Sequence, residues 1–135
     1  MEKATYKLPS MEYRFDINVL GEESKVNYFG NFLYKRPTIG EKSLIDQMRA
    51  RLNGDLRTID DNVALNNEAL SYLRFTLREY PDFWKESQFG FNLIDENVLL
   101  EIYNKVVQFE ADWRKRVYGE PEGVKVGENQ STQSF

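Results

Sequence analysis

The sequence predicts an α+β fold, in which an N-terminal antiparallel β-hairpin packs on a small bundle of three helices. Two patterns carry this prediction. Apolar residues alternate with polar ones over 12–19, which is typical of a half-buried strand, and they recur every three or four residues over 98–117, which indicates an amphipathic helix. The length of 135 residues fits one domain. We expect it to span 11–118, after a flexible leader at 1–10 and before a disordered polar tail at 119–135.

The hairpin is predicted from two strand-like runs separated by a turn. A polar break at 21–24 divides them, and the second run, 25–35, follows closely enough to pair antiparallel with the first. Pro37 ends the second strand because proline cannot donate to a ladder. The first strand is expected to face the core with Tyr13, Phe15, Ile17 and Val19.

The second run raises a question, because the stretch YFGNFLYKRPT at 28–38 is apolar at both odd and even positions. In a regular strand Phe29 and Leu33 would share one face, and Phe32 would lie on the other. A bulge at Gly30 would merge the two faces and let the core account for both. Without a bulge, Phe29 and Leu33 would form a candidate protein-binding surface. The sequence leaves both alternatives open.

The first helix is predicted to begin after Thr38, whose spacing to Glu41 is that of a capping box. It is predicted to end at Asn53-Gly54, since glycine commonly follows the last helical residue. Its apolar stripe consists of Leu44, Ile45, Met48 and Leu52.

Two further helices are predicted from caps and apolar spacing. A connector over 55–59 leads to Asp60 or Asp61 as the N-cap of the second helix. That helix should end before Pro81, because the residue preceding a proline is disfavoured in helical geometry. Asp95 is predicted to cap the third helix. The core stripe of this helix is Val98, Ile102, Val106, Phe109, Trp113 and Val117.

Between the second and third helices, 81–93 is predicted to be an aromatic loop. Phe83 and Trp84 would plug the end of the helical core. Phe89 and Phe91 would instead anchor a protein partner if they stayed partly exposed, since aromatic residues dominate contact hot spots. Together with the strand residues, the candidate protein-binding residues are Phe29, Leu33, Phe83, Trp84, Phe89 and Phe91.

Composition excludes most enzyme classes. The chain has no cysteine and no histidine, so disulfides, thiolate zinc sites and histidine bases are absent. The pairs Asp60-Asp61 and Asp95-Glu96 fall at predicted helix starts, where carboxylates act as caps. No glycine-rich phosphate motif occurs. We expect a non-enzymatic protein with no catalytic residue, no cofactor and no metal.

Charge and hydropathy restrict the partners. The net charge of −4 gives no footprint for nucleic acid, and the basic run at 114–116 is interpreted as a solvated helix end. No window approaches the roughly 18 apolar residues that span a bilayer, and the N-terminus lacks the apolar core of a secretory signal. We therefore expect a protein partner, no nucleic acid and no membrane, and a location in the cytoplasm.

The order of these parts resembles the small tail assembly chaperones of long-tailed bacteriophages, over about 30–118. The resemblance rests on a few punctuating residues at family-like spacing. They are Gly30-x-Phe32-x-x-x-Arg36-Pro37-Thr38, the helix end Arg51-Leu52-Asn53-Gly54, Asp60, the segment Leu77-Arg78-Glu79-Tyr80-Pro81-Asp82-Phe83-Trp84, and Asp95 followed by Val106-x-x-Phe109-Glu110.

The resemblance implies a non-enzymatic protein that coats the tape-measure protein in the infected cell and leaves before the tail is complete. Its partner would be the tape-measure protein or another tail protein, and self-association is compatible with this role. The alternative is a small virion structural or adaptor protein that stays in the particle, held by the edge of the hairpin. A small enzyme with carboxylate or serine chemistry is the least favoured hypothesis.

Overall fold

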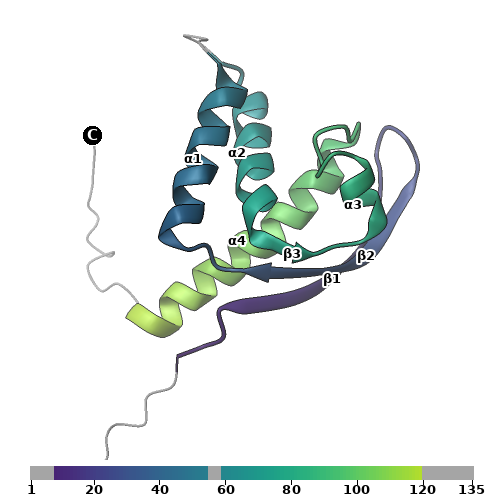
Figure 1. Ribbon diagram of the computed structural model, residues 1–135. Helices are drawn as coiled ribbons and strands as arrows, with labels where there is room; N and C mark the ends of the chain where they lie inside the picture. Colours follow the sequence, from purple (N-terminus) through teal and green to yellow (C-terminus); the bar gives the residue numbers. More distant parts are fainter. Residues whose placement is uncertain (1–7, 55–58, 120–135) are drawn as a thin grey trace, which may run out of the picture.

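The computed structural model describes residues 8–54 and 59–119. Most of the predicted leader, the connector at 55–58 and the predicted tail after Gly119 lie outside the described residues. Along the chain the elements are β1 (Glu12–Leu20), β2 (Asn27–Lys35), α1 (Ile39–Asn53), α2 (Asp61–Thr76), β3 (Leu77–Glu79), α3 (Asp82–Glu86) and α4 (Glu96–Tyr118), as Figure 1 shows. The predicted α+β class is confirmed.

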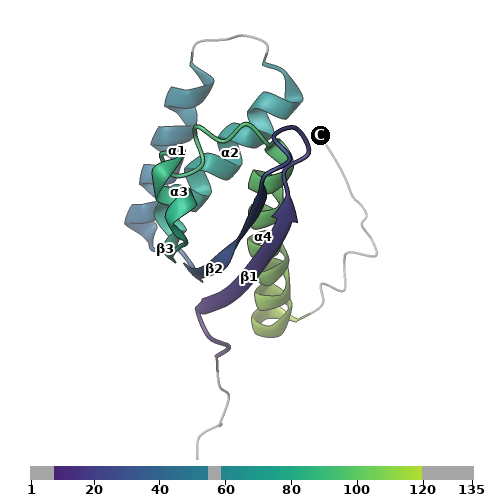
Figure 2. The ribbon, with the colours of Figure 1, turned by 90° about the vertical axis from the view of Figure 1, so that its right-hand side faces the viewer.

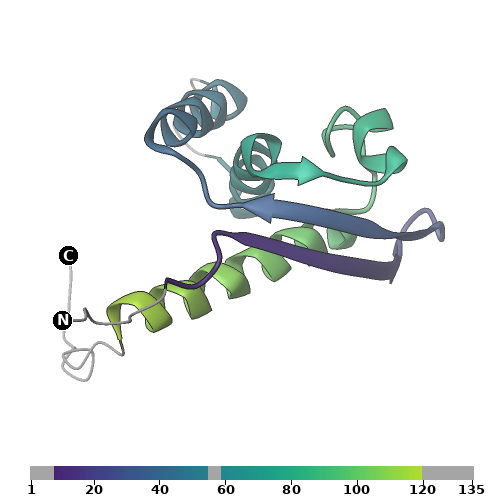
Figure 3. The same cartoon turned by 60° about the horizontal axis from the view of Figure 1, so that its bottom comes forward.

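The strands form an antiparallel sheet in the order β1-β2-β3, with β2 in the centre. β1 and β2 pair along their whole length in one continuous register, in which Phe15 lies opposite Phe32 and Ile17 opposite Gly30. α4 runs along one face of this hairpin, α2 packs on α4, and α1 packs on α2 (Figures 2 and 3). The core therefore lies between one face of the sheet and the helices α2 and α4.

The core is rich in stacked and edge-on aromatic rings. Phe32 lies 5.3 Å from Phe15 and 6.1 Å from Trp84 between ring centroids, and Tyr13 stacks on Phe109 of α4 at 4.9 Å. Such pairs add about 0.5–1.5 kcal/mol each beyond the area they bury. The predicted inward positions of the first strand are confirmed, since Phe15 and Ile17 are buried in this core and Tyr13 and Val19 pack against it.

Two predicted helix starts are confirmed in atomic detail. Thr38 accepts from the Glu41 N–H through Oγ1, and the Glu41 carboxylate accepts from the Thr38 N–H, which completes the capping box. The hydrogen bond from the Thr38 N–H is the largest cause that lowers the pKa of Glu41, and hydrogen bonds from Arg78 to the same carboxylate add to it. Asp60 caps α2 by accepting from the N–H groups of Asn62 and Val63. Local sequence therefore determines where α1 and α2 begin.

The second helix is shorter than predicted, and the sheet has a third strand. α2 ends at Thr76, and the next three residues form β3, where Leu77 lies opposite Tyr34 and Glu79 opposite Leu33. Extended backbone at Leu77 buries its side chain and pairs the free edge of β2. These tertiary contacts outweigh another helical turn before Pro81. The hairpin is therefore part of a three-stranded sheet, and the aromatic segment contains the short helix α3.

Gly30 does not form a bulge. The β1–β2 register continues through Gly30, so Phe29 and Phe32 lie on opposite faces of the sheet. Gly30 has φ +156°, and a Cβ at this position would lie 2.5 Å from Cβ of Pro81 and 2.6 Å from its Cγ. Glycine is needed here because Pro81 approaches the strand closely, and the ladder irregularity lies instead at Leu33/Tyr34, against β3.

Asp95 precedes α4 as predicted, but its side chain makes no capping hydrogen bond. The carboxylate reaches the β1–β2 turn instead, where it accepts from the N–H groups of Glu23 and Ser24 at 2.7 and 2.9 Å and from the Ser24 hydroxyl at 2.6 Å. The Ser24 hydroxyl bond is the largest cause that lowers the pKa of Asp95. Asp95 therefore joins the hairpin turn to the start of α4.

Candidate protein-binding surface

The face of the sheet opposite the core is mainly polar at its centre. Arg14 of β1 forms an ion pair with Glu79 of β3 at 2.9 Å and donates to the side chain of Asn31 in β2. Asn31 in turn donates to Asp16 at 2.8 Å. This network joins all three strands across the outer face. Phe29 lies on that face, two positions before Asn31, and its side chain remains 65% exposed.

A groove of about 360 Å³ lies beside Phe29, where β2 meets the start of α3. β3 pairs only with Leu33 and Tyr34, so the first half of β2 has no strand on this side. Pro81 and Phe83 approach it instead, and the Phe83 ring lies 5.0 Å from that of Tyr28. The groove is lined by Val26, Asn27, Tyr28, Phe29, Pro81, Asp82 and Phe83.

The structure brings together only some of the predicted binding residues. Phe29 and Phe83 both line the groove, and Leu33 is half-buried on the same face of the sheet as Phe29. Trp84 is fully buried beneath Phe32, so it plugs the core and has no surface to offer a partner. Of the predicted binding residues, Phe29 and Phe83 therefore form the groove, and Leu33 adds apolar surface on the face that carries Phe29.

The other two predicted residues lie in the turn after α3 and do not line the groove. Phe89 is half-buried, edge-on to Tyr80 at 5.7 Å, with the guanidinium of Arg74 4.0 Å above its ring. Phe91 is 58% exposed. Gly90 between them has φ +89°, and a Cβ there would lie 2.6 Å from the Trp84 ring. The turn therefore closes over Trp84, and of its two phenylalanines only Phe91 is mainly exposed.

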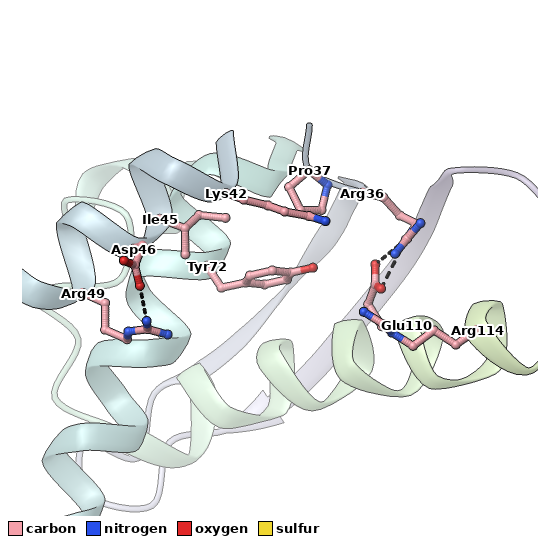
Figure 4. A pocket seen from close by; sticks show the side chains of 9 residues that line it. All are labelled: Arg36, Pro37, Lys42, Ile45, Asp46, Arg49, Tyr72, Glu110 and Arg114. Atoms are coloured by element: carbon pink, nitrogen blue, oxygen red, sulfur yellow. Dashed lines mark hydrogen bonds and ion pairs between the residues drawn. The ribbon is translucent and has the colours of Figure 1, made fainter. Parts of the chain in front are cut away.

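A second hollow, of about 340 Å³, lies where α1, α2 and α4 meet the β2–α1 connection (Figure 4). Its lining is strongly basic, with Arg36 from the connection, Lys42 and Arg49 from α1, and Arg114 from α4. The other residues of the lining are Pro37, Ile45, Asp46, Tyr72 and Glu110. We refer to this hollow as the basic pocket.

A chain of hydrogen bonds forms the inner wall of the basic pocket. Tyr34 donates to the Glu110 carboxylate, and its oxygen lies 2.5 Å from the hydroxyl oxygen of Tyr72. Since a carboxylate only accepts and Tyr34 has one proton, Tyr72 must be the donor to Tyr34. Arg36 Nε donates to the two oxygens of Glu110 at 2.9 and 3.2 Å, and its guanidinium lies 3.7 Å from the centre of the Trp113 ring.

Burial raises the pKa of both tyrosines of this wall. It is the main cause that raises the pKa of Tyr34, and the hydrogen bond to Glu110 adds to it. Burial also raises the pKa of Tyr72 to about 12, although the charges of Arg36 and Arg114 act in the opposite direction. The positive charge of Arg114 therefore acts on the Tyr72 hydroxyl at the pocket wall. Both tyrosine hydroxyls remain neutral at physiological pH.

Little in the sequence indicates the basic pocket, because its residues come from four separated segments and share no motif. Sequence patterns place Arg114 in a basic run at a solvated helix end, and they give Pro37 and Ile45 roles in a strand end and a helix stripe. The structure places Arg114 at the pocket, whereas its two neighbours in the run are not part of the lining. The available signal was the spacing of about one helical turn between Glu110 and Arg114, which places the two side chains on the same side of α4.

Clusters of metal-ligating side chains and membrane-spanning helices were sought in the part of the chain that the structure describes. In residues 8–54 and 59–119 no three metal-ligating side chains come together. None of the described helices combines the length and the apolar character that crossing a membrane requires. No protein-family model, characterised protein or solved structure matches this chain.

Proposed function

We propose that this chain is a non-catalytic protein-binding module that holds an apolar segment of another protein at the β2–α3 groove. The observation that carries the proposal is Phe29, which is largely exposed on a strand and stands beside a groove lined by Val26, Pro81 and Phe83. Exposed apolar residues grouped around a hollow are typical of protein interaction sites.

The exposed area of Phe29 determines how much apolar free energy a partner would gain by covering this side chain. A phenylalanine buries roughly 150–250 Å² when fully covered, so covering its exposed two-thirds removes on the order of 100–170 Å² from water. At about 25 cal/mol per Å² this contributes about 2.5–4 kcal/mol of gross apolar burial. The Phe83 ring is already held against Tyr28, so it contributes apolar surface with little loss of side-chain entropy on binding.

The resemblance to tail assembly chaperones supports a specific partner. We infer that the bound segment belongs to the tape-measure protein of a long-tailed bacteriophage, and that the chain protects it in the cytoplasm of the infected cell. A long apolar protein awaiting assembly needs its exposed side chains covered, and a groove flanked by Phe29 and Phe83 offers a place for one or two of them.

The test is co-expression with the tape-measure protein of the same phage. Phe29→Asp combined with Leu33→Asp should abolish co-purification and leave the far-UV circular dichroism unchanged. The matched control is Ile39→Asp combined with Ile94→Asp, which also removes two exposed apolar residues, 87% and 66% exposed, that do not line the groove. Equal loss of binding in both pairs would refute the groove, and unfolding of the first pair alone would show that its residues belong to the core.

A second function is favoured by the position of β1 as an edge strand of the sheet that residues 8–54 and 59–119 form. The strand order places this nine-residue strand at the border of the sheet, where a further strand from another protein could pair with it. This geometry suits a virion structural or adaptor protein that stays in the particle. Mass spectrometry of purified virions separates the two functions: the chaperone should be absent from them, and stoichiometric presence would favour the adaptor.

A further inference from the structure

The basic pocket carries more positive charge than its own acids neutralise. Its lining contains four cations and two carboxylates. Glu110 is paired with Arg36, and Asp46 is paired with Arg49. Across residues 8–54 and 59–119, Lys42 and Arg114 take part in no ion pair. Two positive charges are therefore concentrated at one hollow of a chain whose net charge is −4.

Arg36 adds directed donors to these two charges. Among the described residues, both side-chain hydrogen bonds of Arg36 are donated by Nε to the Glu110 carboxylate, so the two terminal nitrogens do not bond Glu110. The Trp113 ring and the Glu110 carboxylate hold the guanidinium in place from two directions. A guanidinium that is already fixed loses little entropy when it binds an oxyanion, and its fork geometry suits phosphate.

The hydrogen bonds of the wall prevent the pocket's own carboxylate from repelling an anion strongly. Glu110 accepts from Tyr34 and from Arg36, so its charge is compensated within the wall. Tyr72 donates to Tyr34, which orders the chain of donors toward Glu110. The positive side chains of Lys42 and Arg114 are left to face the hollow (Figure 4).

We propose that the basic pocket binds the phosphate of a small phosphomonoester, with Lys42, Arg114 and the terminal nitrogens of Arg36 as its binding groups. A phosphomonoester carries about −1.5 to −2 charges at pH 7, which matches two unpaired cations. The volume of about 340 Å³ lies at the lower end of small-ligand pockets, so the molecule is small. Ile45 and Pro37 supply apolar contact for its carbon part. This site lies apart from the β2–α3 groove and goes beyond the proposed protein-binding function.

The experiment is an NMR titration of the full chain with inorganic phosphate and with glycerol 3-phosphate, against sodium chloride at matched ionic strength. Both phosphates should shift the backbone amides of 36–49 and 110–114 in a saturable way. Lys42→Gln combined with Arg114→Gln should weaken both at least tenfold, and Lys42→Arg combined with Arg114→Lys should restore binding to within about threefold of the wild type.

The matched control is Arg51→Gln combined with Lys85→Gln, which removes the same charge from exposed positions outside the pocket. It should leave the affinity for glycerol 3-phosphate unchanged. The proposal is overturned if the control weakens binding as much as the pocket variant does, since that indicates general screening. It is also overturned if acetate shifts the same amides with equal affinity, or if neither phosphate gives saturable shifts.

Discussion

Replacing Gly30 with alanine tests the closest approach between the sheet and the segment that follows β3. The added Cβ would lie 2.5 and 2.6 Å from two carbons of Pro81, whereas such carbons normally meet at about 3.5–4.0 Å. Overpacking of this kind costs about 1–3 kcal/mol, and the φ of +156° adds strain of about 1 kcal/mol. The smaller entropy of the unfolded alanine chain offsets about 0.4–1 kcal/mol.

The expected result for Gly30→Ala is a loss of about 1–3 kcal/mol in the free energy of unfolding, measured from urea titrations followed by circular dichroism. Gly40→Ala is the matched control. Gly40 lies in the first turn of α1, and an added Cβ meets nothing nearer than Thr38 Oγ1 at 4.0 Å. This control should gain about 0.5–1 kcal/mol, because alanine is the better helix former.

Two outcomes would refute the reasoning on Gly30. Wild-type stability in Gly30→Ala would mean that Pro81 does not lie against β2, and that the flexibility of glycine serves another purpose there. In a double-mutant cycle, Pro81→Gly should recover part of the loss caused by Gly30→Ala, because it removes the ring carbons that clash. Strictly additive effects would show that the clash is not the cause.

Two further predictions concern buried polar groups. Tyr34→Phe removes the hydroxyl between Tyr72 and Glu110 and should lower the free energy of unfolding by about 1–3 kcal/mol in urea titrations. Tyr13→Phe is the control, because the Tyr13 hydroxyl is not part of that network, and it should change the free energy of unfolding by less than about 0.5 kcal/mol. Because the folded state lowers the pKa of Asp95 from its ordinary value of 3.8, the stability that this carboxylate contributes is present above pH 3.8 and is lost as the pH falls through the folded pKa. The urea midpoints of wild type and Asp95→Asn should therefore differ most at neutral pH and converge below pH 3.8, and a difference that stays constant with pH would contradict the lowered pKa.

The sequence predicted those features that depend on neighbours within one helical turn or one strand. Thr38 and Asp60 cap their helices through residues two or three positions away, and the alternation in β1 reports directly which side chains face the core. The apolar stripe over 98–117 predicted a long amphipathic helix, and the structure places this helix, α4, along one face of the hairpin.

Features that depend on distant residues could not be predicted in the same way. β3 exists because the edge of β2 was free to pair, and Gly30 is constrained by a proline 51 positions later. Asp95 occupies a helix N-cap position, yet its carboxylate serves a turn near the N-terminus. The basic pocket likewise forms only when four segments of the chain meet. Residue spacing within any one of those segments therefore could not predict it.

The link between Asp95 and the hairpin turn has a consequence for the order of folding. β1 and β2 are neighbours in the chain and close a short loop, so their pairing carries a small entropic cost. Their turn, however, is held by a carboxylate 71 and 72 residues further on, at the start of the last helix. The tip of the hairpin therefore reaches its final order only when α4 docks. Substitutions of Ser24 should therefore raise the unfolding rate constant more than they lower the folding rate constant. The contact between Asp95 and the turn would then stabilise the folded domain mainly by slowing its unfolding.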